Sequence, residues 1–260
     1  MNPALMLLMR AGASFDVASL SGLKLWLDAS DASTITQSGG LVSLWADKSG
    51  QAFHVSQATD ANKPTYDATK LGGRGAVYFG ASAQRALQSA TVSGLVNTSS
   101  LTVHAVIVRR GALLKYSTII GQMQPTPAAG KGFALNFATA NSGGLGTDAF
   151  LPTGTTSGAS GAIAHAPKVV TATVSPLSDI RLAASTRLRV GGTELTPTAY
   201  GSATTISMES AILTVGNWIP SRVDMGWPGD ICELIVRSAA ATTSEITATE
   251  QYLAKKWGIA

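Results

Sequence analysis

The acidic residues of this chain fall into two groups whose spacing could support chemistry. Asp28, Asp31 and Asp47 lie in or beside predicted turns, whereas Asp230 and Glu233 lie on one predicted strand. Hydrolysis of a glycosidic bond requires two carboxyl groups that flank it, about 5 Å apart for a retaining mechanism and further apart for an inverting one. On a regular strand, the spacing of Asp230 and Glu233 would direct their side chains to opposite faces of the sheet. We therefore expect no catalytic carboxylate pair and a protein without enzymatic activity.

Asp28, Asp31 and Asp47 are also candidate calcium ligands, because calcium prefers carboxylate and carbonyl oxygens. Each of them can instead form a turn, since an aspartate carboxylate readily accepts hydrogen bonds from the backbone that follows it. Turn formation accounts for all of these positions. We therefore predict no metal and no cofactor, and calcium binding at these residues remains the alternative.

The histidines and the cysteine do not have the spacing of a metal site or of a nucleophile with its base. His54, His104 and His165 are far apart, and no His-Glu-x-x-His pair or Gly-x-Ser-x-Gly motif occurs. Cys232 is the single cysteine, so a disulfide within the chain and a cysteine-based metal cluster are excluded. Because it lies in a predicted strand, we expect a buried and unreactive thiol.

Glycan binding requires an aromatic platform with a few polar groups at a loop rim. Most tryptophans of the chain stand in strand or helix patterns and are predicted to be buried. Trp218 instead lies in a polar loop, together with Asn217, Arg222 and Asp224, and these are our candidate glycan-binding residues. A structural role for Trp218 stays open, since tryptophan side chains are mostly buried.

The segment that carries Asp230 and Glu233 is a predicted strand. Residues 229–237 alternate between two faces and are rich in β-branched side chains. In a regular strand Ile231, Glu233 and Ile235 would share one face, and Cys232 would point to the other.

The segment that follows is the single long helix that the sequence predicts. Residues 242–257 change to a helical period, and Thr242 and Glu245 stand in the positions of a capping box. Gly258 follows as a C-terminal cap. The apolar stripe of this helix consists of Ile246, Leu253 and Trp257.

The rest of the chain is typical of strands and turns. Residues 101–108 form the most apolar predicted strand and should be central, and Gly191-Gly192 predicts a tight hairpin turn. Residues 139–166 are rich in Gly, Ser and Thr and are predicted to be a loop. Further strands are predicted at 23–28, 41–46, 51–57, 75–79, 85–88, 116–122, 132–137, 168–174, 187–190 and 211–215.

Composition limits the classes of partner. The 260 residues suit one large β-domain, with 45% hydrophobic and only 13% charged residues, against a usual charged share of about 25%. The net charge of +4 comes from scattered Lys and Arg, so we expect no nucleic-acid binding. No stretch reaches the roughly 18 apolar residues of a membrane span, so we expect no membrane insertion.

The chain starts with an apolar segment that does not fit a signal peptide, because it lacks a basic beginning and Arg10 interrupts it. We predict that residues 1–21 form an arm and that residues 22–260 form the β-domain. The arm would anchor the protein to a neighbouring subunit through the residues Leu5, Met6, Leu7, Leu8 and Met9.

Five motifs carry a family resemblance: LWLDASD at 25–31, VSLWADKSG at 42–50, GAVYFG at 75–80, GDICELIV at 229–236 and EQYLAKKWGI at 250–259. With them, residues 22–259 resemble concanavalin A-like (laminin G-like) jelly-roll domains, above all those of phage virion proteins and bacterial secreted proteins. The resemblance implies an all-β jelly-roll sandwich of two antiparallel sheets with one C-terminal α-helix. It says little about activity, because this architecture carries lectins, hydrolases and assembly modules.

The phage resemblance leads us to expect a non-enzymatic structural protein of a tailed-phage virion, as a head decoration, fibre, collar or tail-associated component. Its expected partners are other virion proteins, further copies of itself in the particle and host surface glycans. The first alternative is a bacterial extracellular carbohydrate-binding or adhesion module. The second alternative is a glycan depolymerase.

Overall fold

The computed structural model describes residues 15–80, 85–92, 95, 98–114, 116–123, 132–138, 144–149, 155–159, 163, 165–175, 186–196, 198–200, 211–217 and 225–260. The predicted anchoring residues Leu5, Met6, Leu7, Leu8 and Met9 lie outside the described residues. The division into an arm at 1–21 and a domain at 22–260 therefore stays a prediction.

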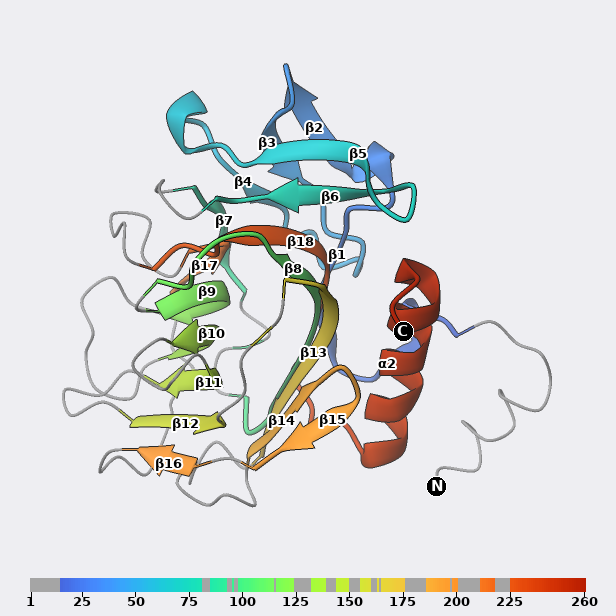
Figure 1. Cartoon of the computed structure of the whole chain (residues 1–260), viewed down its shortest axis with the longest axis vertical. Coiled ribbons are helices and arrows are strands. Elements are labelled where there is room, and N and C mark those ends of the chain that lie inside the picture. Colours follow the sequence, from blue (N-terminus) through green and yellow to red (C-terminus); the bar gives the residue numbers. More distant parts are fainter. Residues whose placement is uncertain are drawn as a thin grey trace.

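The described elements are strands, short 3-10 helices and one α-helix (Figure 1). The strands up to the middle of the chain are β1 (Leu23–Asp28), β2 (Ile35–Ser38), β3 (Leu41–Trp45), β4 (Val55–Ser56), β5 (Thr65–Leu71), β6 (Arg74–Tyr78), β7 (Leu87–Thr91), β8 (Leu101–Arg109) and β9 (Tyr116–Met123). They are followed by β10 (Gly132–Ala138), β11 (Gly144–Ala149), β12 (Thr155–Ala159), β13 (Pro167–Val174), β14 (Thr186–Val190), β15 (Thr193–Leu195), β16 (Thr198–Tyr200), β17 (Ile212–Val215) and β18 (Gly229–Arg237). The helices are η1 (Val17–Ser19), η2 (Ala32–Thr34), η3 (Asp60–Asn62) and α2 (Thr243–Trp257).

The strands form two layers of antiparallel sheet. The first layer runs β15-β14-β13-β8-β18, and the other edge of β18 pairs with both β1 and β6 before β5 continues the layer. The second layer runs β7-β17-β9-β10-β11-β12-β16, and β3 and β4 link it to the first. Our prediction of an all-β jelly-roll sandwich with one C-terminal helix is confirmed.

The core lies between these two layers. β8 is central in the first layer, with β18 and β13 on either side, and its residues 101–108 are all buried, as predicted. Alternate residues of β8, such as Ala105 and Ile107, point into the core. There they meet side chains of the second layer, among them Ile119, Phe133, Leu135, Phe137, Leu213 and Val215.

Helix α2 covers the outer face of the first layer, on the side away from the core, and lies against β13 and β8 (Figure 1). The predicted capping box is present: Thr242 and Glu245 exchange side-chain and backbone hydrogen bonds at the helix start. Gly258 ends the helix in the left-handed conformation that glycine adopts without strain. The helix and the sheet share a second apolar cluster that includes Leu253, Trp257, Val106, Val169 and Ile235. None of the helices in the described ranges is long and apolar enough to cross a membrane.

Strand β18 departs from the predicted alternation. Its pairing with β8 shifts register between Ile231 and Glu233, which marks a β-bulge. Ile231 and Leu234 therefore both point into the core between the layers, and Cys232 joins the cluster under α2. The predicted alternation is wrong for Ile231 and Cys232, because the bulge changes it partway along the strand, whereas Glu233 and Ile235 do share one face.

Two further predictions are corrected. Residues 139–166 do not form a single loop, because β11 and β12 lie within this range and extend the second layer. The predicted strand at 51–57 is shorter than expected, since only β4 pairs with β3. Strands β2 and β5 were not predicted, because their side chains are mostly exposed and lack an apolar alternation.

Candidate functional site

Five charged side chains meet where α2 packs on the sheet, and we call them the carboxylate–lysine cluster: Asp28, Asp31, Lys48, Glu233 and Lys256. Asp28 ends β1 and lies directly opposite Glu233 in the pairing of β1 with β18. Lys256 comes from the last turn of α2, and Lys48 follows β3. The cluster therefore connects segments that are far apart in the chain.

Glu233 is the most deeply buried residue of this cluster. Its carboxylate accepts hydrogen bonds from Trp26 Nε1 at 2.9 Å, Lys256 Nζ at 2.8 Å and Trp257 Nε1 at 2.7 Å. Only 1% of the residue is exposed. Burial raises the pKa of Glu233 and the nearby charge of Asp28 adds to this, while Lys256 and Trp257 act in the opposite direction. Glu233 is therefore a saturated carboxylate that ties the helix to the sheet.

Asp28 lies on the other side of the Lys256 ammonium. Lys256 Nζ is 2.9 Å from its Oδ1, and Lys48 Nζ is 3.1 Å from its Oδ2 and 2.9 Å from Asp31 Oδ2. Burial alone would raise the pKa of Asp28, but Lys256, the Ser30 hydroxyl and Lys48 together lower it below its ordinary value. The two neighbouring carboxyl groups, Asp28 and Glu233, thus have pKa values shifted in opposite directions.

Such opposed shifts are the pattern of an acid and base pair in catalysis. In a glycosidase, however, the space between the two carboxyl groups must admit the bond that is cleaved. Here the Lys256 ammonium lies within hydrogen-bond distance of both Asp28 and Glu233. In this conformation the pair holds the last turn of α2 against the sheet. Sequence reasoning missed the pair, because it depends on cross-strand register and on the distant helix.

Aromatic rings surround the lysines of this cluster. Lys48 Nζ lies 4.6 Å from the centroid of the Trp26 ring, and Lys256 Nζ lies 5.7 Å from that of Tyr252. Phe15 stacks on Tyr252 with ring centroids 4.9 Å apart. Trp26 is partly exposed at this edge, although its position in a strand pattern predicted a buried side chain. The other described tryptophans are buried as predicted: Trp45, Trp227 and Trp257.

Asp47, the third predicted calcium candidate, is occupied by the backbone. Its carboxylate accepts hydrogen bonds from the N–H groups of Trp26, Ser49 and Phe53 and from the Ser49 hydroxyl. The Asp47 N–H in turn donates to His54 Nδ1 at 3.0 Å. These contacts organise the turn after β3, which is the role that turn chemistry predicts for an aspartate.

The expectation that no metal is bound, with calcium at Asp28, Asp31 and Asp47 as the alternative, stays a prediction. Asp31 accepts hydrogen bonds from the N–H and hydroxyl groups of Ser33, and Lys48 bridges Asp31 and Asp28. Within the described ranges, no three His, Cys, Asp or Glu side chains are grouped so that they could hold a metal ion.

His104 and Cys232 are fully buried in the sheet. His104 Nδ1 lies 3.0 Å from the Thr171 hydroxyl oxygen, and burial, together with the charge of Arg237, lowers the pKa of the imidazole to about 3. Burial likewise raises the pKa of the Cys232 thiol well above its ordinary value, which agrees with the unreactive thiol that the sequence predicts.

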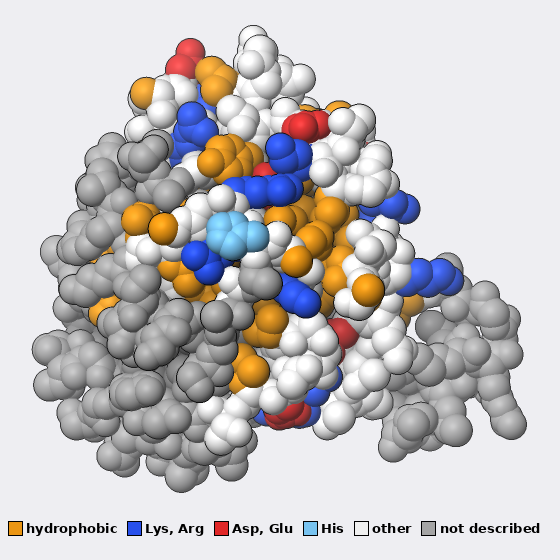
Figure 2. All heavy atoms as spheres, viewed as in Figure 1, with side chains coloured by type: hydrophobic (Ala, Val, Ile, Leu, Met, Phe, Trp, Pro, Cys, Tyr) orange, Lys and Arg blue, Asp and Glu red, His pale blue; other side chains and the backbone are white. Residues whose placement is uncertain are grey.

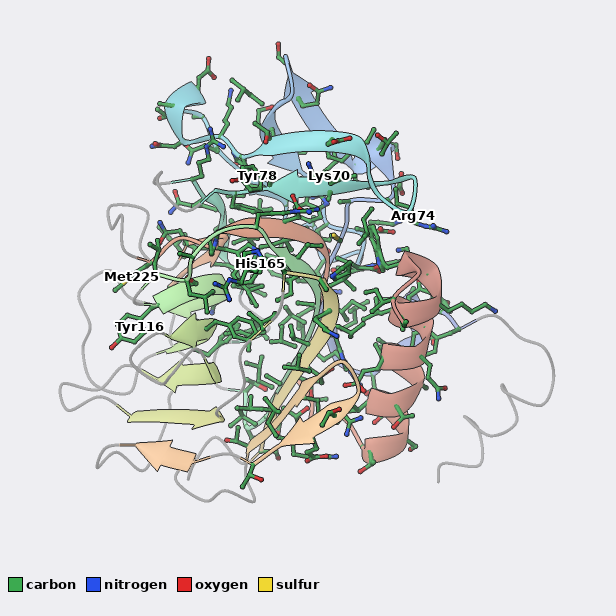
Figure 3. The ribbon with its side chains drawn as sticks, in the orientation of Figure 1. Lys70, Arg74, Tyr78, Tyr116, His165 and Met225 are labelled. Carbon is green, nitrogen blue, oxygen red and sulfur yellow. The ribbon has the colours of Figure 1, made fainter. Side chains whose placement is uncertain are left out.

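A second group of polar residues lies beyond the last turn of α2, and we call it the Asp230 surface: Asp230, Arg110, Lys70, Tyr78 and His165. Arg110 Nε donates to Asp230 Oδ2 at 2.6 Å, and Tyr78 on β6 lies directly opposite Asp230 on β18. Figure 3 labels Lys70, Tyr78 and His165 in this part of the molecule. The bulge in β18 places Asp230 and Glu233 on the same face, which corrects the prediction that they face opposite sides.

One residue of the predicted glycan-binding set, Asn217, lies in the described part of the chain. Asn217 is buried two residues after the end of β17. Trp218, Arg222 and Asp224 lie outside the described residues, so this set is not tested.

No protein-family model and no curated protein sequence matches this chain. Solved structures do match. Domain 4 of AbnA, an extracellular GH43 arabinanase from Geobacillus stearothermophilus, in complex with arabinotriose, is 14% identical with a TM-score of 0.60, covering 89% of this chain and 99% of that one. Trypanosoma rangeli sialidase in complex with sialic acid is 11% identical with a TM-score of 0.60, covering 95% of this chain and 35% of the sialidase. An arabinofuranosidase complexed with arabinofuranosyl-alpha-1,2-xylobiose is 14% identical with a TM-score of 0.58, covering 92% of this chain and 60% of that one.

These similarities correct the functional expectation. The matched structures belong to carbohydrate-active proteins and do not support a link to phage particles. The prediction of a non-enzymatic structural protein of a phage virion is therefore wrong on this comparison, and so is the prediction that enzymatic activity is absent. At this level of identity the likeness shows the fold. This chain spans about a third of the sialidase chain.

Proposed function

We propose that this chain is a concanavalin A-like β-sandwich that recognises glycans within a carbohydrate-active protein. The observation that carries the proposal is the match to Domain 4 of the arabinanase, because it extends over nearly the whole of both chains. That domain was solved with arabinotriose, so a β-sandwich of this size and layout can hold a short oligosaccharide.

The surface of the chain is compatible with this role. Charged residues make up only 13% of the chain, and hydroxyl-bearing and small side chains replace them. Sugars are recognised by directional hydrogen bonds and by contact with aromatic faces, and neither requires a high net charge. The partly exposed aromatic residues at the edge of α2 and on β6 offer such contacts: Trp26, Tyr252 and Tyr78.

Binding of the folded protein to an array of arabinan, xylan, pectin and sialylated oligosaccharides tests the proposal. We expect saturable binding to at least one class, confirmed by calorimetric titration with a soluble oligosaccharide of that class. Binding to none of them, with circular dichroism that shows an intact β-fold, would contradict the proposed function.

A second candidate function is glycan hydrolysis, and the opposed pKa shifts of Asp28 and Glu233 favour it. Hydrolysis at this site requires the Lys256 ammonium to move away from Asp28 and Glu233 when a substrate binds. Release of reducing ends from the bound polysaccharide, abolished by Asp28→Asn, would support hydrolysis at this pair. Unchanged release by that variant would exclude these carboxyl groups, and no release by the wild-type protein would leave glycan recognition alone.

A further inference from the structure

Part of the outer face of the first layer extends beyond α2. One row of cross-strand neighbours runs over this part, from Pro167 on β13 through Val108 and Asp230 to Tyr78 on β6. Residues opposite one another in antiparallel strands point to the same face, and Val108 belongs to the apolar cluster on the helix side. Asp230 and Tyr78 therefore lie on the outer face.

Asp230 is a buried carboxylate with unused hydrogen-bonding capacity. Its side chain is 1% exposed and its Oδ2 accepts from Arg110 Nε, while Oδ1 has no hydrogen-bond partner in the described part of the chain. A buried polar atom without a partner is uncommon in a stable fold. The Asp230 surface therefore has an acceptor that the fold itself does not satisfy.

Arg110 is oriented by Asp230 but presents its other nitrogens outward. Its side chain is 39% exposed, and its backbone N–H is fixed by the Pro228 carbonyl at 2.8 Å. Its terminal guanidinium nitrogens make no hydrogen bond to a described residue. An arginine held through Nε presents two parallel N–H donors, which is the geometry that binds a carboxylate in a bidentate manner.

Lys70 adds positive charge near Asp230. Its side chain is 39% exposed and its Nζ pairs with Asp67 Oδ2 at 4.0 Å, and the charge of Lys70 lowers the pKa of Asp230 while that of Asp67 raises it. Arg109 donates to the Gly111 and Ile163 carbonyl oxygens and is thus beside the segment that holds His165. In the view of Figure 2, Lys and Arg side chains gather around an exposed histidine, and Figure 3 labels His165 at that place.

We infer that the Asp230 surface binds the carboxylate of an acidic sugar, an inference that rests on the proposed glycan recognition and specifies its ligand. The terminal nitrogens of Arg110 pair with the sugar carboxylate, and Lys70 adds charge at the rim. The half-buried ring of Tyr78 contacts the sugar ring. Asp230 orients Arg110 and is a positioning residue.

Calorimetric titration with trigalacturonic acid, and with its fully methyl-esterified form as a neutral control of the same backbone, tests the inference. We expect binding of the acid at least about tenfold tighter than binding of the ester, because the ester lacks the charge-assisted hydrogen bonds. Affinity for the acid should also fall as salt is raised.

Variants locate the site. Arg110→Gln should weaken binding of the acid about tenfold, and Lys70→Gln should weaken it by a smaller factor. Lys24→Gln removes the same charge near the far end of the pairing of β1 with β18, where Leu25 lies opposite Val236, and should leave affinity unchanged. If Arg110→Gln impairs folding, the affinities of Lys70→Gln and Tyr78→Ala for the acid test the location instead. Neither residue is fully buried, so we expect both variants to fold.

The outcomes separate this inference from the proposed function. Equal affinity for the acid and the ester, or binding of arabinotriose alone, would overturn the acidic ligand and leave glycan recognition standing. Tight binding of the acid that none of Arg110→Gln, Lys70→Gln and Tyr78→Ala weakens would overturn the location. Failure to bind any sugar would overturn both.

Discussion

Strand β18 places two buried carboxylates on the same outer face, and their surroundings differ. Glu233 lies under the last turn of α2 and accepts hydrogen bonds from Trp26, Trp257 and Lys256. Asp230 lies beyond the helix, has Arg110 as its partner and keeps Oδ1 without a partner among the described residues. Burial raises the pKa of both carboxyl groups.

The difference separates a structural carboxylate from one that orients a candidate binding residue, Arg110. A saturated buried network specifies one arrangement of the fold, whereas an incompletely satisfied one costs stability and is found where it has a function. Glu233 should therefore matter for stability, and Asp230 should matter for binding.

The largest effect should come from Glu233→Ala. The substitution leaves the buried indole N–H of Trp257 and the partly buried indole N–H of Trp26 without their acceptor, and it removes one carboxylate from Lys256. We expect a loss of about 3 kcal/mol or more in the free energy of unfolding, measured by urea denaturation at pH 7. A loss below about 1 kcal/mol would show that the helix does not depend on this contact.

Asp28→Asn should have a smaller effect that depends on pH. The pKa of Asp28 is lowered in the folded protein, so its ionised form stabilises the fold above the ordinary pKa of 3.8, and this contribution is lost as pH falls through the folded value. The variant should lose about 1–2 kcal/mol at pH 7 and progressively less on acidification below about pH 4. A loss that does not change between pH 7 and pH 3 would contradict the assignment.

Thr242→Ala should weaken the start of the helix, far from both carboxylates. It removes the capping hydrogen bond to the Glu245 N–H, for which we expect about 1 kcal/mol of destabilisation in thermal or urea unfolding. Thr247→Ala, at a half-buried position of α2 whose hydroxyl donates to the Thr243 carbonyl and caps no terminal N–H, is the matched control. Affinity for an acidic sugar should not change, and a change would mean that the helix takes part in binding.

The smallest effect on stability should come from Asp230→Asn. Because burial raises the pKa of Asp230, ionisation of this side chain opposes folding at neutral pH. Asn carries no charge, so this cost disappears in the variant and offsets the loss of the ion pair with Arg110. We expect the free energy of unfolding at pH 7 to change by less than about 1 kcal/mol, while binding of trigalacturonic acid weakens. A loss as large as that of Glu233→Ala would remove the distinction between the two carboxylates.

The sequence predicts those features of the fold that depend on local pattern. The capping box at Thr242, the glycine after α2 and the apolar run of β8 are all local signals, and each is confirmed. The Gly191-Gly192 turn is likewise confirmed between β14 and β15. In each case the residues that determine the structure are neighbours in the chain.

The sequence does not predict the features that depend on distant partners. The bulge at Ile231 and Glu233 is a shift of register against β8, and side-chain alternation within one strand does not show it. The contact of Lys256 with Asp28 requires knowledge of how α2 lies on the sheet. Strands β11 and β12 are rich in Gly and Thr, a composition that is typical of loops. They extend the second layer through backbone pairing with distant residues, which their own sequence does not reveal.

Chemical-shift mapping by two-dimensional NMR of the labelled protein, titrated with trigalacturonic acid, tests the central claim most directly. We predict saturable shifts at the backbone amides of Tyr78, Arg110 and Asp230, and little change at Glu233 and Lys256. Shifts confined to the helix contact, or no shifts with this acid or with neutral oligosaccharides, would contradict it.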